Sequence, residues 1–215
     1  MKLPFTIEQF LDVFRQYNIA VWPIQIFLIV LALIAVYFSF RSQTYSNKVI
    51  VCILAFFWIW MGAIYHLVYF SRINKVAIVF GILFITQVAI FIHFGLIKNN
   101  LSFRLKTDKF GITGIILIVF ALLIYPLLGY WLGHVYPYSP TFGLPCPTTI
   151  FTFGILLFSV SRISRWIIAI PFLWSLIGFS AAFSLGIKED TGLLVAGLLS
   201  IAMILYRNKS FRTSK

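Results

Sequence analysis

Long apolar stretches, separated by short polar ones, fill most of this 215-residue chain. A membrane-spanning helix needs about 20 consecutive apolar residues, because the hydrocarbon layer of a bilayer is about 30 Å thick. The pattern predicts seven transmembrane helices, although the fifth has only fourteen residues between its flanking breaks. Their expected ranges are about 19–40, 49–70, 76–97, 110–132, 148–161, 166–185 and 191–206.

A shorter amphipathic segment, residues 5–17, precedes the first apolar stretch. Thr6 and Gln9 have the spacing of a capping box, and Phe5 with Phe10 fits the hydrophobic staple that accompanies such a box. A cleavable signal peptide would begin with basic residues and end in small ones, whereas polar residues come first here. We therefore expect an uncleaved, plain lead-in helix, and a helix that rests in the outer membrane interface is the alternative.

The composition points to the same class of protein. Hydrophobic residues make up 61% of the chain and charged residues 10%, and the mean hydropathy is +1.01. Soluble domains have roughly 45–50% apolar and about 25% charged residues. The expected fold is therefore an all-α, polytopic membrane protein in which residues 1–215 form a single integral membrane domain.

The basic residues predict the orientation of the chain in the membrane. Lys and Arg number 17 against 5 acidic residues, which gives a net charge of +12. With the amino terminus outside, twelve basic residues fall in inner segments and five in outer ones, as the positive-inside rule requires. The charge then reflects topology and contact with anionic lipids. Because it is spread thinly over the loops, nucleic acid is not expected as a partner.

A proline-rich outer loop joins the fourth and fifth expected helices. No charged residue occurs between Phe110 and Ser161, so this loop is not built like a solvated one and we expect it to be packed. The short fifth helix suggests that the loop folds inward to membrane depth, where protein must surround its backbone. Its four prolines are Pro137, Pro140, Pro145 and Pro147.

Four sequence blocks resemble an uncharacterised family of bacterial multi-pass membrane proteins. They are Asn18–Gln25, Trp58–Asn74, Gly133–Gly154 and Ser180–Gly192. The most specific part is PTFGLPCPTTIFTFG, at residues 140–154, and one departure is Lys75, where similar proteins tend to have a proline. The resemblance implies a location in the bacterial cytoplasmic membrane, and it implies no particular reaction.

Unusual polar and aromatic residues gather near the outer side on this topology. We expect them to form an outward-facing pocket that binds or transports a small uncharged or weakly anionic ligand. An interfacial belt of aromatic residues is the alternative interpretation of the tryptophans and tyrosines. The candidate pocket residues are Trp22, Gln25, Trp58, His66, His134, Tyr136, Thr148, Thr149 and Trp174.

The start of the fifth helix, near Pro147 or Thr148, is a candidate anion site. The free N–H groups of a helix amino end attract anions and carboxylates. Simple capping by the side chain of Thr148 or Thr149 is the alternative.

A metal site is a further hypothesis. His66, His134 and Cys146 supply imidazole and thiolate groups that suit a soft metal ion. Their spacing matches no metal motif, and ordinary packing or hydrogen bonding also accounts for each of them. The sequence therefore requires no cofactor.

The acidic residues argue against a carboxylate relay within the membrane, because all of them fall in expected termini or loops. No catalytic triad or phosphate-binding loop is evident either, so the sequence favours a function other than catalysis. The acidic residues are Glu8, Asp12, Asp108, Glu189 and Asp190.

Two other functions stay open. One is an intramembrane enzyme that acts on a lipid or quinone, with His66 or His134 as the acid–base group. The other is a structural or assembly partner in a membrane complex, which would pack through the small residues of Gly178–Ala182 and Gly192–Gly197.

Overall fold

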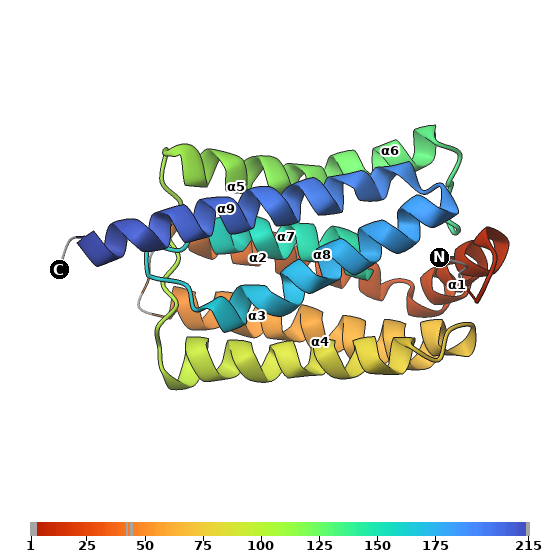
Figure 1. The fold of residues 1–215 in the computed structure, drawn as a ribbon, viewed down its shortest axis with the longest axis horizontal. Coiled ribbons are helices and arrows are strands. Elements are labelled where there is room, and N and C mark those ends of the chain that lie inside the picture. The colour runs from red at the N-terminus through yellow and green to blue at the C-terminus, as the bar shows by residue number, and fades with distance from the viewer. Residues whose placement is uncertain (1–3, 42, 44, 214–215) are drawn as a thin grey trace.

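The computed structural model describes residues 4–41, 43 and 45–213, which form a bundle of helices (Figure 1). The β-type pairings within these residues are isolated bridges, Phe103 with Ser159 and Phe142 with Leu144. The all-α fold class is thereby confirmed. The α-helices are α1 Ile7–Val21, α2 Ile24–Phe40, α3 Ser46–Trp60, α4 Ala77–Phe91, α5 Lys109–Val119, α6 Tyr125–Trp131, α7 Pro145–Leu157, α8 Arg165–Leu185 and α9 Thr191–Thr213.

Short π- and 3₁₀-helical segments extend several of these helices, so that α3 with its extension and α5 with α6 form long continuous rods. The π-helical segments are η1 Met61–Tyr69, η3 Ile92–Ile97 and η4 Phe120–Ile124, and the 3₁₀ segments are η2 Phe70–Arg72 and η5 Lys188–Asp190.

Five rods of the described chain are long and apolar enough to cross a membrane. A sixth is added if α1 and α2, which meet at 85°, count as one broken span. The fifth expected segment corresponds to α7, whose 13 residues are too few to cross the hydrocarbon layer at 1.5 Å per residue. The five passing rods are Ser46–Arg72, Ala77–Ile97, Lys109–Trp131, Arg165–Leu185 and Lys188–Phe211.

The outside of the bundle is apolar. Ile82 of α4, Ile116 of α5 and Val195 of α9 are each more than half exposed, and many large apolar side chains around them are exposed as well. A soluble protein rarely shows so much contiguous apolar surface. Together with the length of the helices, this surface indicates a membrane protein.

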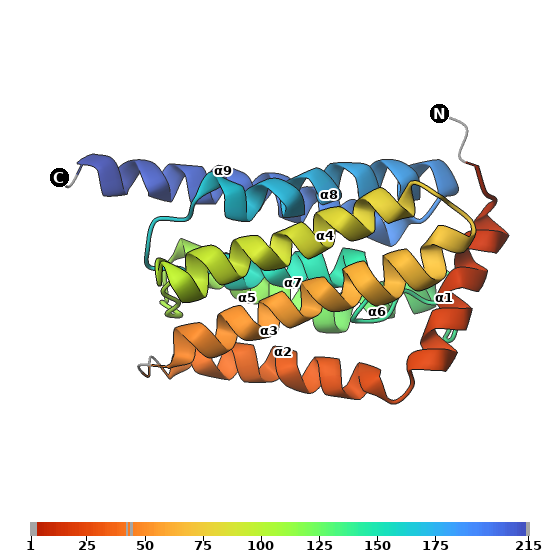
Figure 2. The same ribbon diagram turned by 90° about the horizontal axis from the view of Figure 1, so that it is seen from below.

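Helix α1 lies across one end of the bundle (Figure 2). The predicted capping box is present, because Thr6 N–H donates to Gln9 at 2.9 Å and Gln9 N–H donates to Thr6 at 3.3 Å. The rings of Phe5 and Phe10 stack at 5.8 Å between centroids, as expected for the staple. The helix continues to Val21, four residues beyond the expected lead-in segment. We call this end the amino-terminal face and the opposite end the carboxy-terminal face.

Helix α7 is the centre of the bundle, since every residue in it except Cys146 is buried. It crosses α5 so closely that a Cβ atom on Gly114 would lie 2.7 Å from the carbonyl oxygen of Gly154. The carbonyl groups at its carboxyl end are satisfied by Arg207 of α9, which donates to Leu157 at 2.8 Å and to Leu156 at 3.3 Å. A short apolar helix can therefore end inside the protein with its backbone hydrogen-bonded.

The proline-rich segment before α7 is exposed in its first half and buried in its second. Gly143 allows the turn into α7, since it has φ +101° and a Cβ atom there would lie 2.4 Å from Leu28. Tyr17 of α1 donates to the Gly143 carbonyl at 3.2 Å, and Gly143 N–H donates to Thr148 at 3.0 Å. Hydrogen bonds thus tie this segment to α1 and to the first turn of α7.

Candidate functional site

A cavity of about 440 Å³ lies beneath α1 at the amino-terminal face. The rings of Phe5, Phe10 and Phe14, from the start of the described chain and from α1, form one wall. The small-residue stretch of α8 around Gly178 and Ala181 also lines the cavity. A volume of this size is within the range of small-molecule sites, which are mostly apolar with a few polar groups.

The polar groups of this cavity come from the turn between α8 and α9 and from the start of α7. Asp190 lines the cavity although only 4% of it is exposed. The hydroxyl of Tyr125 donates a hydrogen bond to the Asp190 carboxylate. Cys146, which also lines the cavity, lies beside both Asp190 and the indole of Trp174.

Glu189 extends this polar group toward the surface. It is 3% exposed, and its Oε1 atom lies 2.6 Å from Nδ1 of His134, while Oε2 has no hydrogen-bond partner. The side chain of His134 keeps 14% of its surface exposed. Two pairs of titratable groups therefore lie next to each other, His134 with Glu189 toward the surface and Tyr125 with Asp190 at the cavity, and such groups can accept a hydrogen bond from a ligand or hold a proton.

The local sequence explains why two adjacent acids are buried here. Gly186 ends α8 with a left-handed residue at φ +76°, a conformation that glycine adopts without strain. The chain then makes the single turn of η5, which places Glu189 and Asp190 at the start of the rod that continues as α9. A buried carboxyl group needs a partner, and His134 and Tyr125 provide one for each acid.

The sequence placed Glu189 and Asp190 in a loop, and they do lie in the turn between α8 and α9, but both side chains are buried there. The available signal was their position directly before an apolar stretch, in a chain with only 5 acidic residues. Tyr125, inside the apolar fourth stretch, gave no comparable signal.

His66 lies next to this site, in the π-helical segment η1. It is fully buried, with its ring 5.0 Å from that of Trp174 and 4.6 Å from that of Phe84, and neither ring nitrogen has a hydrogen-bond partner. A π-helical turn contains one extra residue and is frequent at functional sites. Trp174 lines the cavity, and its indole N–H also has no partner.

A separate polar network involves Gln25 and the proline-rich segment. The amide of Asn18 donates to the carbonyls of Pro137 at 2.7 Å and Ser139 at 2.8 Å. The amide of Gln25 donates in turn to Asn18 at 2.7 Å and to Thr141 at 3.0 Å. These bonds join α1, α2 and the loop, so Gln25 has a structural role here.

The structure does not gather the other candidate pocket residues around the cavity. Trp22 is 57% exposed, and Tyr136 is 48% exposed with its hydroxyl donating to the Asn18 carbonyl. Trp58 donates to Thr152 inside the core at 3.1 Å. Thr148 accepts the Gly143 N–H, and Thr149 is buried without a partner. Of the nine candidates, only Trp174 lines this cavity, with His66 and His134 in contact with residues that line or extend it.

The hypothesised metal and anion sites gain no support. Among the described residues no group of three or more His, Cys, Asp and Glu side chains could hold a metal ion, so His66, His134 and Cys146 are not assembled as a metal site. Helix α7 begins at Pro145 after Leu144, and neither Thr148 nor Thr149 caps it. Because Pro145 and Pro147 have no N–H, the first turn lacks two of the donors that a helix amino end usually offers to an anion.

Comparison with known proteins supports the resemblance found in the sequence, and it does not identify an activity. The chain matches no curated protein and no solved structure. Residues 7–215 match a family of unknown function, DUF6064. Because the match covers nearly the whole chain, the protein belongs to this family of unknown function, DUF6064.

Proposed function

We propose that this protein is a multi-pass protein of the bacterial cytoplasmic membrane that binds a small, largely apolar ligand carrying a hydrogen-bond donor. The cavity beneath α1 supports this proposal, because its apolar walls converge on one buried carboxyl group, that of Asp190. The apolar walls would hold the body of the ligand, and Asp190 would accept its donor group.

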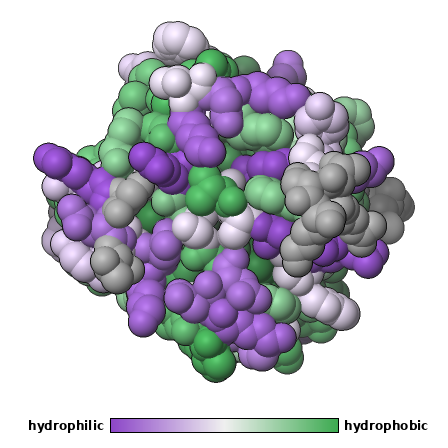
Figure 3. Space-filling view, turned by 90° about the vertical axis from the view of Figure 1, so that its left-hand side faces the viewer, coloured by the Kyte–Doolittle hydropathy of each residue, from purple (hydrophilic) through white to green (hydrophobic). Residues whose placement is uncertain are grey.

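The proposed topology places the amino-terminal face outside and the carboxy-terminal face inside. The loops that carry Arg41, Lys98, Arg104 and Arg162 all lie at the carboxy-terminal face, as does the start of α3, which carries Lys48 (Figure 1). Hydrophilic side chains are spread over much of this end (Figure 3). Basic residues concentrate on the cytoplasmic side of membrane proteins. Of the seven proposed membrane segments, α7 is the short one, reached through the buried part of the proline-rich segment.

The charges around the cavity favour an uncharged or basic ligand over the weakly anionic one considered from the sequence. Asp190 at the cavity and Glu189 beside it offer hydrogen-bond acceptors, and whenever either acid is ionised it would repel a carboxylate ligand in a medium of low dielectric constant. The prolines at the start of α7 remove two of the N–H groups that would have compensated such a charge. An alcohol or amine with an apolar body fits these groups best.

Binding is proposed rather than transport, because a dense core lies between the cavity and the opposite face. This core includes the fully buried rings of Phe91, Phe103, Phe151, Phe153 and Phe158. A role as an assembly partner is less favoured, because the glycines invoked for it pack within the chain. A Cβ atom on Gly192 would lie 2.4 Å from Phe120, and one on Gly197 would lie 2.2 Å from Ser175.

The head-group preference of the cavity tests this proposal. The protein in lipid nanodiscs is titrated with 1-octanol, octylamine and octanoate, which share an alkyl chain and differ in the head group. We expect the alcohol and the amine to bind about tenfold more tightly than octanoate, which is the effect of one hydrogen bond to a charged group. Octanoate binding as tightly as the amine would contradict the proposal.

Substitution of Asp190 tests whether the head-group preference arises from this carboxyl group. The Asp190→Asn variant should lose the difference between octylamine and octanoate while it still binds octanol. Asp12→Asn is the matched control, because Asp12 is an exposed acid of α1 that pairs with Arg15 at 2.6 Å, outside the cavity. The hydrogen bond from Arg15 lowers the pKa of Asp12, which keeps this acid charged and the comparison simple. Equal changes in both variants would count against a role of Asp190.

A further inference from the structure

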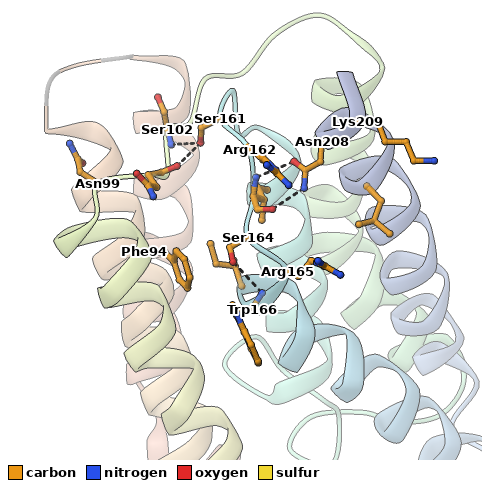
Figure 4. Close-up of a pocket in the computed structure, with 14 residues that line it drawn as sticks. Phe94, Asn99, Ser102, Ser161, Arg162, Ser164, Arg165, Trp166, Asn208 and Lys209 are labelled. Carbon is orange, nitrogen blue, oxygen red and sulfur yellow. Dashed lines mark hydrogen bonds between the residues drawn. The ribbon is translucent and has the colours of Figure 1, made fainter. Parts of the chain in front are cut away.

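A second cavity, of about 960 Å³, lies at the carboxy-terminal face (Figure 4). It is bounded by the end of the rod formed by α4 and η3, by the link between α7 and α8, and by the last turns of α9. Three basic side chains line it: Arg162 from the link between α7 and α8, Arg165 from the first turn of α8, and Lys209 from α9.

These three basic residues have no acidic partner. All five acidic residues of the chain lie within the described part, and none of them lines this cavity. The ion pairs in that part are Arg15 with Asp12 and His134 with Glu189, both toward the amino-terminal face. Three positive charges around one hollow without a counter-charge create a field that favours an anion.

Hydrogen bonds hold the segment that presents the two arginines. Asn208 of α9 accepts from the N–H of Ile163 at 3.1 Å and donates to its carbonyl at 2.8 Å, which fixes the residue directly after Arg162 (Figure 4). The hydroxyl of Ser161 donates to the Asn100 carbonyl at 2.8 Å. The position of this link is therefore set by contacts with two other parts of the chain, and the cavity is not a gap between free loops.

The same cavity has an apolar side, which distinguishes a lipid from a soluble anion. Trp166 lines it and is 68% exposed, and Leu205 lines it and is 41% exposed. Tryptophan is enriched where the lipid head groups meet the acyl chains. Basic pockets between membrane helices on the cytoplasmic side are suited to phospholipid head groups.

We propose that this cavity binds the phosphate group of an anionic phospholipid, with Arg162, Arg165 and Lys209 around the phosphate and the acyl chains along Trp166 and Leu205. A phosphate group could also reach these residues from solution, as inorganic phosphate or glycerol phosphate. The apolar side favours the lipid, because a soluble phosphate would leave Trp166 and Leu205 without a partner.

Lipid binding to the purified protein in a neutral detergent tests the proposal. The probes are short-chain phosphatidylglycerol, phosphatidylcholine of the same chain length, glycerol phosphate and inorganic phosphate. We expect phosphatidylglycerol to bind more tightly than the other three. Phosphatidylcholine binding equally would overturn the role of the charges, and glycerol phosphate or inorganic phosphate binding equally would overturn the role of the lipid.

Two matched double variants separate this cavity from the general charge of the face. Arg162→Gln with Arg165→Gln should weaken phosphatidylglycerol binding about 30-fold. The control is Arg104→Gln with Lys106→Gln, which removes the same charge from a neighbouring cavity at the same face and should change binding less than about threefold. Equal losses would overturn the proposed site.

Because the two arginines and Trp166 are exposed, the variants should fold, which their melting temperatures will show. Trp166→Ala should weaken lipid binding and leave any phosphate binding unchanged.

Discussion

Arg207 shows how a single residue allows the central helix to end inside the protein. It is 8% exposed, its guanidinium donates to the last carbonyl groups of α7, and it lies 5.0 Å from the ring centroid of Phe110. The carboxyl end of a helix carries partial negative charge, so a cation is favoured there. From the sequence, Arg207 was counted only as one of the basic residues that set the topology.

Removing this cation should destabilise the protein. We expect Arg207→Gln to lower the free energy of unfolding by about 1–3 kcal/mol, because buried carbonyl groups lose their charged donor. Thermal melting of the purified protein measures the effect, with Lys98→Gln, an exposed lysine of the same face, as the control. An Arg207→Gln protein that melts with the wild type would show that the α7 carbonyls are satisfied in another way.

Residue-scale prediction from the sequence succeeds where the interaction is local. The capping box of Thr6 and Gln9 was predictable because both partners lie within one turn of helix. The pairing of His134 with Glu189 was not, because the two are 55 residues apart. Hydropathy places such residues at the same end of a membrane, and it does not say which of them touch.

At the scale of the element, α8 contains a proline whose cost is offset by a neighbouring helix. Pro171 has no N–H, so the carbonyl of Ile167, four residues earlier, lacks its usual helical partner. The amide of Gln87 in α4 donates to this carbonyl at 2.9 Å. Gln87, a polar residue within the apolar helix α4, thus has a structural role: its hydrogen bond joins α4 to α8.

This relation predicts a non-additive pair of substitutions. Gln87→Leu alone should destabilise the protein by about 1–3 kcal/mol, because the buried Ile167 carbonyl loses its donor. In a Pro171→Ala background the new N–H can serve that carbonyl, so the same substitution should cost less by at least about 0.5 kcal/mol. Unfolding free energies of the four proteins give the coupling, and strictly additive costs would contradict the role assigned to Gln87.

The boundaries of α7 show why the sequence predicted an element and missed its ends. The expected helix was 148–161, and the observed one is Pro145–Leu157. It begins earlier because prolines are well tolerated in the first turn of a helix. It ends earlier because the chain turns to pair with another loop, where Arg104 N–H donates to Phe158 at 2.9 Å and Val160 N–H donates to Ser102 at 2.8 Å.

At the scale of the whole molecule, the two ends of the bundle differ in chemistry. The amino-terminal face has buried carboxyl groups beside an apolar cavity, and the carboxy-terminal face has unpaired basic residues around a second cavity. The hydropathy pattern predicted an all-helical protein and the segments that form its rods. The cavity could not be predicted, because it depends on how far α1 continues and on the 85° bend that lays α1 across the bundle.

The most direct test of the central claim is to fill the cavity beneath α1 and measure octylamine binding in nanodiscs. Ala181 of α8 lines the cavity, whereas Ala169 of the same helix is exposed outside it. Ala181→Phe should weaken octylamine binding at least about tenfold, since the ring would occupy the volume needed by the alkyl chain. Ala169→Phe should bind octylamine as the wild type does. An Ala181→Phe protein that is folded and binds octylamine with wild-type affinity would contradict the proposed site.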